Sequence, residues 1–307
     1  MGLKELLFMD TPVPSLRGRK VLITGAASGI GRATAQAAAA RGAELVLTDL
    51  HADQLDEVVA AITAADGTVL YHVAGDVSDF DWVAGFARQV DAEVGVMDVV
   101  MNIAGISAWG TVENLEHRHW RKLVDVNLMG PIHIIESFVP QMIRRGRGGH
   151  IVNVSSAAGL LALPWHAAYS ASKFGLRGVS EVLRFDLRRH GIGVSLVCPG
   201  GVDTPLVDSV EIVGIDRENP RVKAAINGFH KVAVSPDVAA AAILTGIRKN
   251  RFMVYTSFDI RFGYWWARKF ALPYEIAMRV ANDRFDRLAR VSAKSLEATA
   301  TDEHSSR

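Results

Sequence analysis

The chain has 307 residues, of which 49% are hydrophobic and 22% charged, so it can bury one large core. A net charge of +1 argues against generic nucleic-acid binding, and no stretch approaches the roughly 20 apolar residues that span a bilayer. The apolar run at residues 6–9 is too short for a secretory signal, and the ten histidines show no metal-ligand spacing. The single cysteine, Cys198, suits a reducing compartment, so we expect a cytoplasmic protein that binds no metal.

Short apolar runs alternate with helical patterns along the chain. We expect strands at residues 20–24, 44–49, 69–73, 99–102, 150–155, 193–198 and 252–256, with helices between them. The helix after Ser78 shows the pattern, because its apolar residues recur at helical spacing through Val83, Phe86 and Val90. No internal repeat occurs. The sequence therefore predicts an α/β fold with a doubly wound, seven-stranded parallel sheet covered by helices on both faces.

A glycine-rich loop follows the first expected strand. Thr24 is followed by Gly25, Ala26, Ala27, Ser28, Gly29, Ile30 and Gly31, and an alanine-rich helix begins there. Glycines let the backbone approach a ligand, and the free amides of a helix N-terminus attract negative charge. The loop therefore predicts a pyrophosphate site, although a plain strand-to-helix turn has a similar composition.

Asp49 ends the second expected strand, eighteen residues after Gly31. A carboxylate at this place can accept hydrogen bonds from an adenosine ribose and repels a 2′-phosphate, which favours NAD over NADP. Neither Leu50 nor His51 offers an arginine to such a phosphate. At the end of the third strand, Asp76 and the Val77 amide are placed to hold adenine.

Tyr169 and Lys173 are four residues apart, and Ser156 lies thirteen residues before the tyrosine. In a helix, positions i and i+4 share one face, so the Lys173 ammonium can lie beside the phenol and favour its charged form. A hydroxyl group at Ser156 supplies a second hydrogen-bonding group for an alcohol oxygen. A Tyr and Lys pair at this spacing also arises by chance, so the evidence is the order of all the motifs together.

These motifs resemble the short-chain dehydrogenase/reductase family over about residues 20–255. The glycine loop matches TGxxxGIG, residues 102–105 match NNAG with Ile103 replacing the second Asn, and residues 199–204 match PGxVxT. The resemblance implies a Rossmann-like fold, a homodimer or homotetramer, and a nicotinamide cofactor. It also implies that two long helices, at about 117–145 and 167–190, pair between subunits. The first contains Pro131 and Pro140, so we expect it to be kinked or interrupted.

The same resemblance assigns roles to individual residues. It makes Tyr169 the general acid/base, Ser156 the group that orients the substrate oxygen, Lys173 the ligand of the nicotinamide ribose, and Asn127 the holder of a water in a proton relay. Alternation along the preceding strand implies that Ser155 faces away from the site. The expected cofactor-binding residues are Gly25, Ser28, Gly29, Ile30, Gly31, Asp49, Asp76, Val77, Asn102, Ala104, Gly105, Tyr169, Lys173, Pro199, Gly200, Val202 and Thr204.

The expected substrate walls are apolar. Most of them are hydrophobic: Ile106, Ser107, Ala108 and Trp109 after the fourth strand; Leu160, Leu161, Leu163, Pro164 and Trp165 before Tyr169; and Leu206, Val207 and Val210 after Thr204. Such walls indicate a lipophilic secondary alcohol or ketone, such as a steroid, retinoid, terpenoid or fatty-chain carbonyl. Two alternatives are an NADPH-dependent 3-oxoacyl thioester reductase and a non-catalytic cofactor-binding protein.

We divide the chain into an N-terminal extension (1–17), one catalytic domain (18–256) with a substrate loop at about 205–235, an amphipathic aromatic extension (257–294) and a disordered tail (295–307). Residues 248–290 carry ten Lys or Arg against four Asp or Glu, together with many aromatic residues. This extension can pack on the body of the protein or another subunit, cover the substrate pocket, or make peripheral contact with a membrane.

Overall fold

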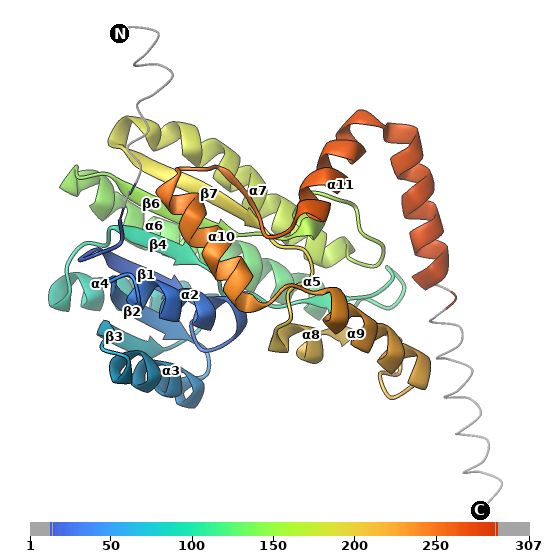
Figure 1. The fold of residues 1–307 in the computed structure, drawn as a ribbon, viewed down its shortest axis with the longest axis horizontal. Helices are drawn as coiled ribbons and strands as arrows, with labels where there is room; N and C mark the ends of the chain where they lie inside the picture. Colours follow the sequence, from blue (N-terminus) through green and yellow to red (C-terminus); the bar gives the residue numbers. More distant parts are fainter. Residues whose placement is uncertain (1–12, 14, 286, 288–307) are drawn as a thin grey trace, which may run out of the picture.

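The computed structural model describes residues 13, 15–285 and 287. Its main sheet has seven parallel strands in the order β3-β2-β1-β4-β6-β7-β9 (Figure 1). The strands are β1 (Lys20–Thr24), β2 (Glu44–Asp49), β3 (Thr68–Ala74), β4 (Val99–Asn102), β6 (Gly149–Val154), β7 (Ile192–Cys198) and β9 (Met253–Tyr255). The seven predicted strands are thus confirmed, with bounds that differ by one residue at most.

Helices cover both faces of the sheet (Figure 1). One face carries α2 (Gly29–Ala39), α3 (Ala52–Ala64) and α10 (Pro236–Arg248); the other carries α4 (Phe80–Glu93), α6 (Gly130–Arg145) and α7 (Ala167–Asp186). Side chains of a strand alternate between the faces, so Val21 and Ile23 enter one core while Leu22 enters the other. The predicted doubly wound, Rossmann-like architecture is confirmed.

The first long helix of the sequence prediction is interrupted. It consists of α5 (His117–Val124), a π-helical turn (Asp125–Met129) and α6. Pro131 lies in the first turn of α6, where a missing N–H is tolerated, and Pro140 lies inside that helix. The second long helix is α7, which a short 3₁₀ turn (Arg188–His190) follows.

The predicted substrate loop, residues 205–235, contains two helices, α8 (Pro205–Ser209) and α9 (Pro220–Val232), with β8 (Glu211–Ile212) between them. Strand β8 pairs in parallel with β5 (Ala108–Trp109), which follows β4. The sequence did not predict this two-stranded sheet. It brings the substrate loop against the segment that leaves the fourth strand of the main sheet.

The C-terminal extension is helical. It comprises α11 (Phe258–Lys269) and a further helix over residues 271–285, which lie at the same end of the molecule as α8 and α9 (Figure 1). On the inner side, the Tyr274 hydroxyl accepts a hydrogen bond from the Ala162 amide at 2.7 Å. On the outer side, Phe258, Phe262 and Trp265 are exposed. The predicted disordered tail lies outside the described residues.

Within the described part of the chain, no helix is both long enough and apolar enough to cross a membrane.

Candidate active site

Tyr169 and Lys173 lie one turn apart at the start of α7, and both side chains are buried. The Lys173 ammonium donates a hydrogen bond to the Val154 carbonyl oxygen at 3.0 Å, which fixes it against the end of β6. Its nitrogen lies 5.8 Å from the centre of the Tyr169 ring. The helical spacing seen in the sequence therefore brings the two groups together in a dry environment.

The two serines after β6 have different surroundings. Ser155 is buried, and its hydroxyl donates to the Lys173 carbonyl oxygen at 3.0 Å. Ser156 begins a short 3₁₀ turn, where its Oγ accepts the Ala158 amide at 3.1 Å, and hydrogen bonding by its side chain lowers the pKa of the Tyr169 phenol. The expectation that only Ser156 faces Tyr169 is thus in agreement with the structure.

Burial and hydrogen bonding oppose each other at the phenol. Burial raises the pKa of Tyr169 above its ordinary value, while the hydrogen bond with Ser156 lowers it. Burial also lowers the pKa of Lys173 to about 8, because the charged ammonium has lost its water. The polypeptide alone therefore does not bias residue 169 toward phenolate, which differs from the reading of the sequence.

Asn127 lies in the π-helical turn and is fully buried. Its side-chain oxygen accepts the Ile106 amide at 2.9 Å, and its Nδ2 donates to the Ile106 carbonyl at 2.9 Å and to Ser172 Oγ at 3.2 Å. A Cβ added at Gly105 would lie 3.0 Å from Asn127 Oδ1 and 3.3 Å from Lys173 Nζ. Asn127 therefore ties the segment after β4 to α7, beside Lys173.

The glycine loop joins β1 to α2 in a tight turn. A Cβ on Gly31 would lie 1.8 Å from the Gly25 carbonyl oxygen, and one on Gly25 would lie 2.7 Å from the Ala104 backbone. Gly29 has φ +50, a conformation that favours glycine. At the start of α2, Ser28 makes no side-chain capping bond and the first turn has no acid, so the amides around Ile30 suit an anion.

Acidic residues end the two neighbouring strands. The Asp49 carboxylate accepts the Ala27 amide at 2.9 Å and the His51 amide at 3.1 Å, so it lies against the glycine loop. Asp76 follows β3 and accepts both the amide and the hydroxyl of Ser78. The next residue, Val77, is buried, and its carbonyl oxygen lies 3.0 Å from His133 Nδ1.

The remaining predicted cofactor residues lie at the carboxyl ends of β4 and β7. Ala104 donates its amide to Thr24 Oγ1 at 3.1 Å, while the Asn102 side chain donates to Asn153 inside the sheet. A Cβ added at Gly29 would lie 3.1 Å and 3.2 Å from two side-chain carbons of Thr204, so the loop after β7 packs against the glycine loop. The other members of this loop keep it folded, through contacts of Pro199 with Ala157, Gly200 with Thr256, and Val202 with Val234.

An apolar cluster surrounds Tyr169 on its other side. It contains Ala108, Ile106 and Leu163, which the sequence analysis predicted as walls of the substrate pocket. Two further members, Trp120 of α5 and Val213, were missed by sequence reasoning. Val213 follows β8, whose pairing with β5 has no periodic signal in the sequence. The His166 ring is buried between Trp109 and Tyr169, at centroid distances of 4.5 and 6.1 Å.

In the described ranges, no group of three or more His, Cys, Asp or Glu side chains could hold a metal ion.

Comparison with known proteins identifies relatives of this chain. EphD of Mycobacterium tuberculosis, named as an oxidoreductase, is 36% identical over 235 residues, which are 75% of this chain but only 40% of EphD. SadH of the same organism, also named as an oxidoreductase, is 34% identical over 80% of this chain and 89% of its own length. FabG of Thermotoga maritima, a 3-oxoacyl-[acyl-carrier-protein] reductase, is 35% identical over 64% of this chain and 78% of its own.

Solved structures share the fold. A short-chain dehydrogenase/reductase from Burkholderia phymatum in complex with NAD superimposes with a TM-score of 0.76 and 29% identity, covering 83% of this chain and 94% of that one. A metagenomic short-chain oxidoreductase in complex with NADP gives a TM-score of 0.63 and 34% identity, covering 78% and 96%. The family model for short chain dehydrogenases matches residues 19–212. The chain therefore belongs to the short-chain dehydrogenase family.

Proposed function

We propose that this protein transfers a hydride between NAD and a lipophilic secondary alcohol or ketone. The observation that carries the proposal is the convergence of Ser156, Tyr169 and Lys173, from the end of β6 and the start of α7, on the buried edge next to the glycine loop. Neighbouring motifs of the same edge supply backbone amides and a carboxylate in the order that a dinucleotide requires.

The residues fit a dinucleotide. The Gly25 and Gly31 positions have no room for a side chain, and the start of α2 offers amides without a capping side chain. Asp49 would accept hydrogen bonds from the adenosine ribose, which supports NAD over NADP. The relatives of known structure include one that contains NAD and one that contains NADP, so the preference rests on Asp49.

Each side chain has a defined task in alcohol oxidation. Tyr169 accepts the hydroxyl proton as phenolate, and Ser156 donates a hydrogen bond that orients the same oxygen. Lys173, whose nitrogen lies 5.8 Å from the centre of the Tyr169 ring, binds the ribose, and Asn127 holds the segment carrying Gly105 and Ile106 in place. A nicotinamide ring bound here would supply the hydride acceptor, and its positive charge in the oxidised form would lower the free energy needed to ionise the buried phenol.

The apolar cluster around Tyr169 supports a lipophilic substrate. Residues such as Ala108, Leu163 and Val213 form that cluster. The alternative of an NADPH-dependent 3-oxoacyl thioester reductase draws support from the similarity to FabG. A non-catalytic role is disfavoured because Ser156, Tyr169 and Lys173 are all present, with the Lys173 nitrogen 5.8 Å from the centre of the Tyr169 ring.

The test is a panel of purified substrates. We expect NADH-dependent reduction of lipophilic ketones to exceed NADPH-dependent reduction, and 3-oxoacyl thioesters to be poor substrates. Faster turnover of a 3-oxoacyl thioester with NADPH would favour the alternative. Turnover confined to a small sugar would contradict the lipophilic class.

The proposal extends to assembly as a homodimer or homotetramer. The outer side of α7 exposes Phe174, Val182 and Phe185, which supports pairing through this helix. Peripheral membrane contact of the C-terminal extension stays a prediction, and the exposed aromatic side of α11 is where it would occur.

A further inference from the structure

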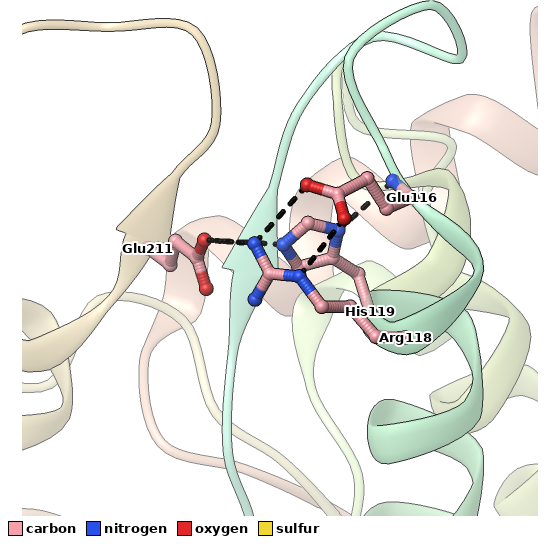
Figure 2. Close-up of polar contacts among 4 residues, drawn as sticks. All are labelled: Glu116, Arg118, His119 and Glu211. Carbon is pink, nitrogen blue, oxygen red and sulfur yellow. Dashed lines mark hydrogen bonds and ion pairs between the residues drawn. The ribbon is translucent and has the colours of Figure 1, made fainter.

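Glu211, the first residue of β8, is joined to the start of α5 by two side chains (Figure 2). Its carboxylate contacts His119 Nε2 at 3.1 Å and Arg118 Nη2 at 3.3 Å. The Arg118 guanidinium also holds Glu116 through Nε at 3.1 Å, so it bridges two carboxylates. We name Glu116, Arg118, His119 and Glu211 the Glu211 latch.

His119 is the fixed part of the latch. Only 3% of its side chain is exposed, compared with 49% for Glu211. Its Nδ1 accepts the Glu116 amide at 2.9 Å, so the ring proton is on Nε2 and points to Glu211 (Figure 2). If Glu211 moved away, this buried N–H would lose its charged acceptor. The contact between β8 and α5 is therefore favoured.

The latch continues directly into the wall beside Tyr169. Glu211 and Ile212 pair with Ala108 and Trp109, and the Val213 amide donates to the Trp109 carbonyl at 2.8 Å. The Val213 side chain then packs against the apolar cluster that contains Tyr169. Two residues of extended chain therefore connect the charged contacts of Glu211 to the substrate side of the phenol.

We propose that Glu211 is a positioning residue that, through His119 and Arg118, holds residues 205–215 closed and so places Val213 in the substrate wall. This inference rests on the proposed function, because the wall matters only if substrate reacts at Tyr169. The latch acts on substrate fit and does not touch the reacting atoms. Its loss should therefore raise KM and leave the proton transfer itself largely unchanged.

Hydrogen exchange measures the closed state without any substrate. In Glu211→Ala, amides at 205–215 should exchange about tenfold faster than in the unchanged protein, because both contacts to α5 are lost. The matched control is Glu218→Ala, which removes the same charge from the same loop but breaks only an exposed pair with Lys223. Glu211→Gln keeps an oxygen for the His119 N–H and should restore most of the protection.

Steady-state kinetics with a lipophilic ketone give the second measurement. For Glu211→Ala we expect KM to rise about tenfold with kcat within about twofold, and for Glu211→Gln a smaller rise. Unchanged exchange at 205–215 in Glu211→Ala, or an equal effect of Glu218→Ala, would overturn the latch. Faster exchange with an unchanged KM would overturn the positioning role. If no carbonyl or alcohol reacts, the proposed function fails, and the exchange experiment still decides whether the latch exists.

Discussion

The Nζ atom of Lys173 lies 5.8 Å from the centre of the Tyr169 ring, and both side chains are buried. Burial lowers the pKa of Lys173 to about 8 from 10.5, so the folded chain binds this proton less tightly than the unfolded chain does. The free energy of unfolding should therefore be lowest below pH 8, where Lys173 is charged in both states, and should increase as the pH rises from 8 toward 10.5. The ammonium to which we assign ribose binding therefore destabilises the folded protein.

Lys173→Met separates these two effects. Removing the buried charge is worth about 3 kcal/mol, and leaving the Val154 carbonyl without its donor costs about 1–3 kcal/mol, so we expect a net gain near 1 kcal/mol at pH 7. Urea unfolding without dinucleotide measures it, and turnover should fall strongly at the same time. Lys122→Met, at an exposed position on α5, is the control. A less stable Lys173→Met protein would contradict the cost assigned to the charge.

Gly31→Ala should weaken dinucleotide binding by about tenfold or more, because a Cβ there would lie 1.8 Å from the Gly25 carbonyl and must distort the loop. Titration calorimetry with NAD measures the change. Gly178→Ala, in α7, adds a Cβ that meets no atom within 4 Å, so its binding should be unchanged and its stability higher by about 0.5–1 kcal/mol. Normal NAD affinity in folded Gly31→Ala would remove the loop from the cofactor site.

Asp49→Asn tests the source of the cofactor preference. Asparagine keeps one oxygen, which can accept only one of the Ala27 and His51 amides that the two carboxylate oxygens now accept, and it removes the charge that repels a 2′-phosphate. We expect the ratio of kcat/KM for NAD over NADP to fall about tenfold, with a loss of about 1 kcal/mol in the free energy of unfolding for the hydrogen bond that is broken. The control is Asp53→Asn, in the first turn of α3. It removes an equal charge but leaves the hydrogen bonds of Asp49 to Ala27 and His51 in place, so the ratio should be unchanged. An unaltered ratio in Asp49→Asn would show that other residues select the cofactor.

His150 should make the protein sensitive to acid. Its ring is buried in β6, with Nε2 at 2.8 Å from Ser195 Oγ, and burial lowers its pKa from 6.5 to about 4. Between these pH values the unfolded chain binds more protons, so stability should fall by about 3 kcal/mol as the pH drops from 6.5 to 4. Denaturant unfolding across this range measures the slope. His150→Gln should have a markedly flatter profile, and an equal slope in both proteins would assign the acid sensitivity elsewhere.

The strands and the order of the site motifs could be predicted from the sequence, because short buried runs end at glycine or polar residues and each motif is local. The pairing of β5 with β8 could not, since two-residue strands have no period. His119 gave no local signal, because its partner Glu211 is 92 residues away in the chain. The raised pKa of Tyr169 could not be predicted from the sequence either, because it depends on burial by residues such as Ala108 and Leu123 that pack around the ring.

Asn127 shows where tertiary structure refines a sequence motif. The prolines predicted a kink or an interruption of the long helix, and the structure has a π-helical turn at residues 125–129, just before Pro131. The turn directs the Asn127 amide to both backbone groups of Ile106. Its resemblance-based role in a water relay stays a prediction.

The measurement that tests the account most directly is turnover of Tyr169→Phe with NAD and a reactive secondary alcohol. This change removes one oxygen atom from a buried ring and keeps its packing. The account predicts that kcat falls by at least about a hundredfold, while NAD binds with nearly its normal affinity. Turnover within a fewfold of the unchanged protein would contradict proton transfer at residue 169.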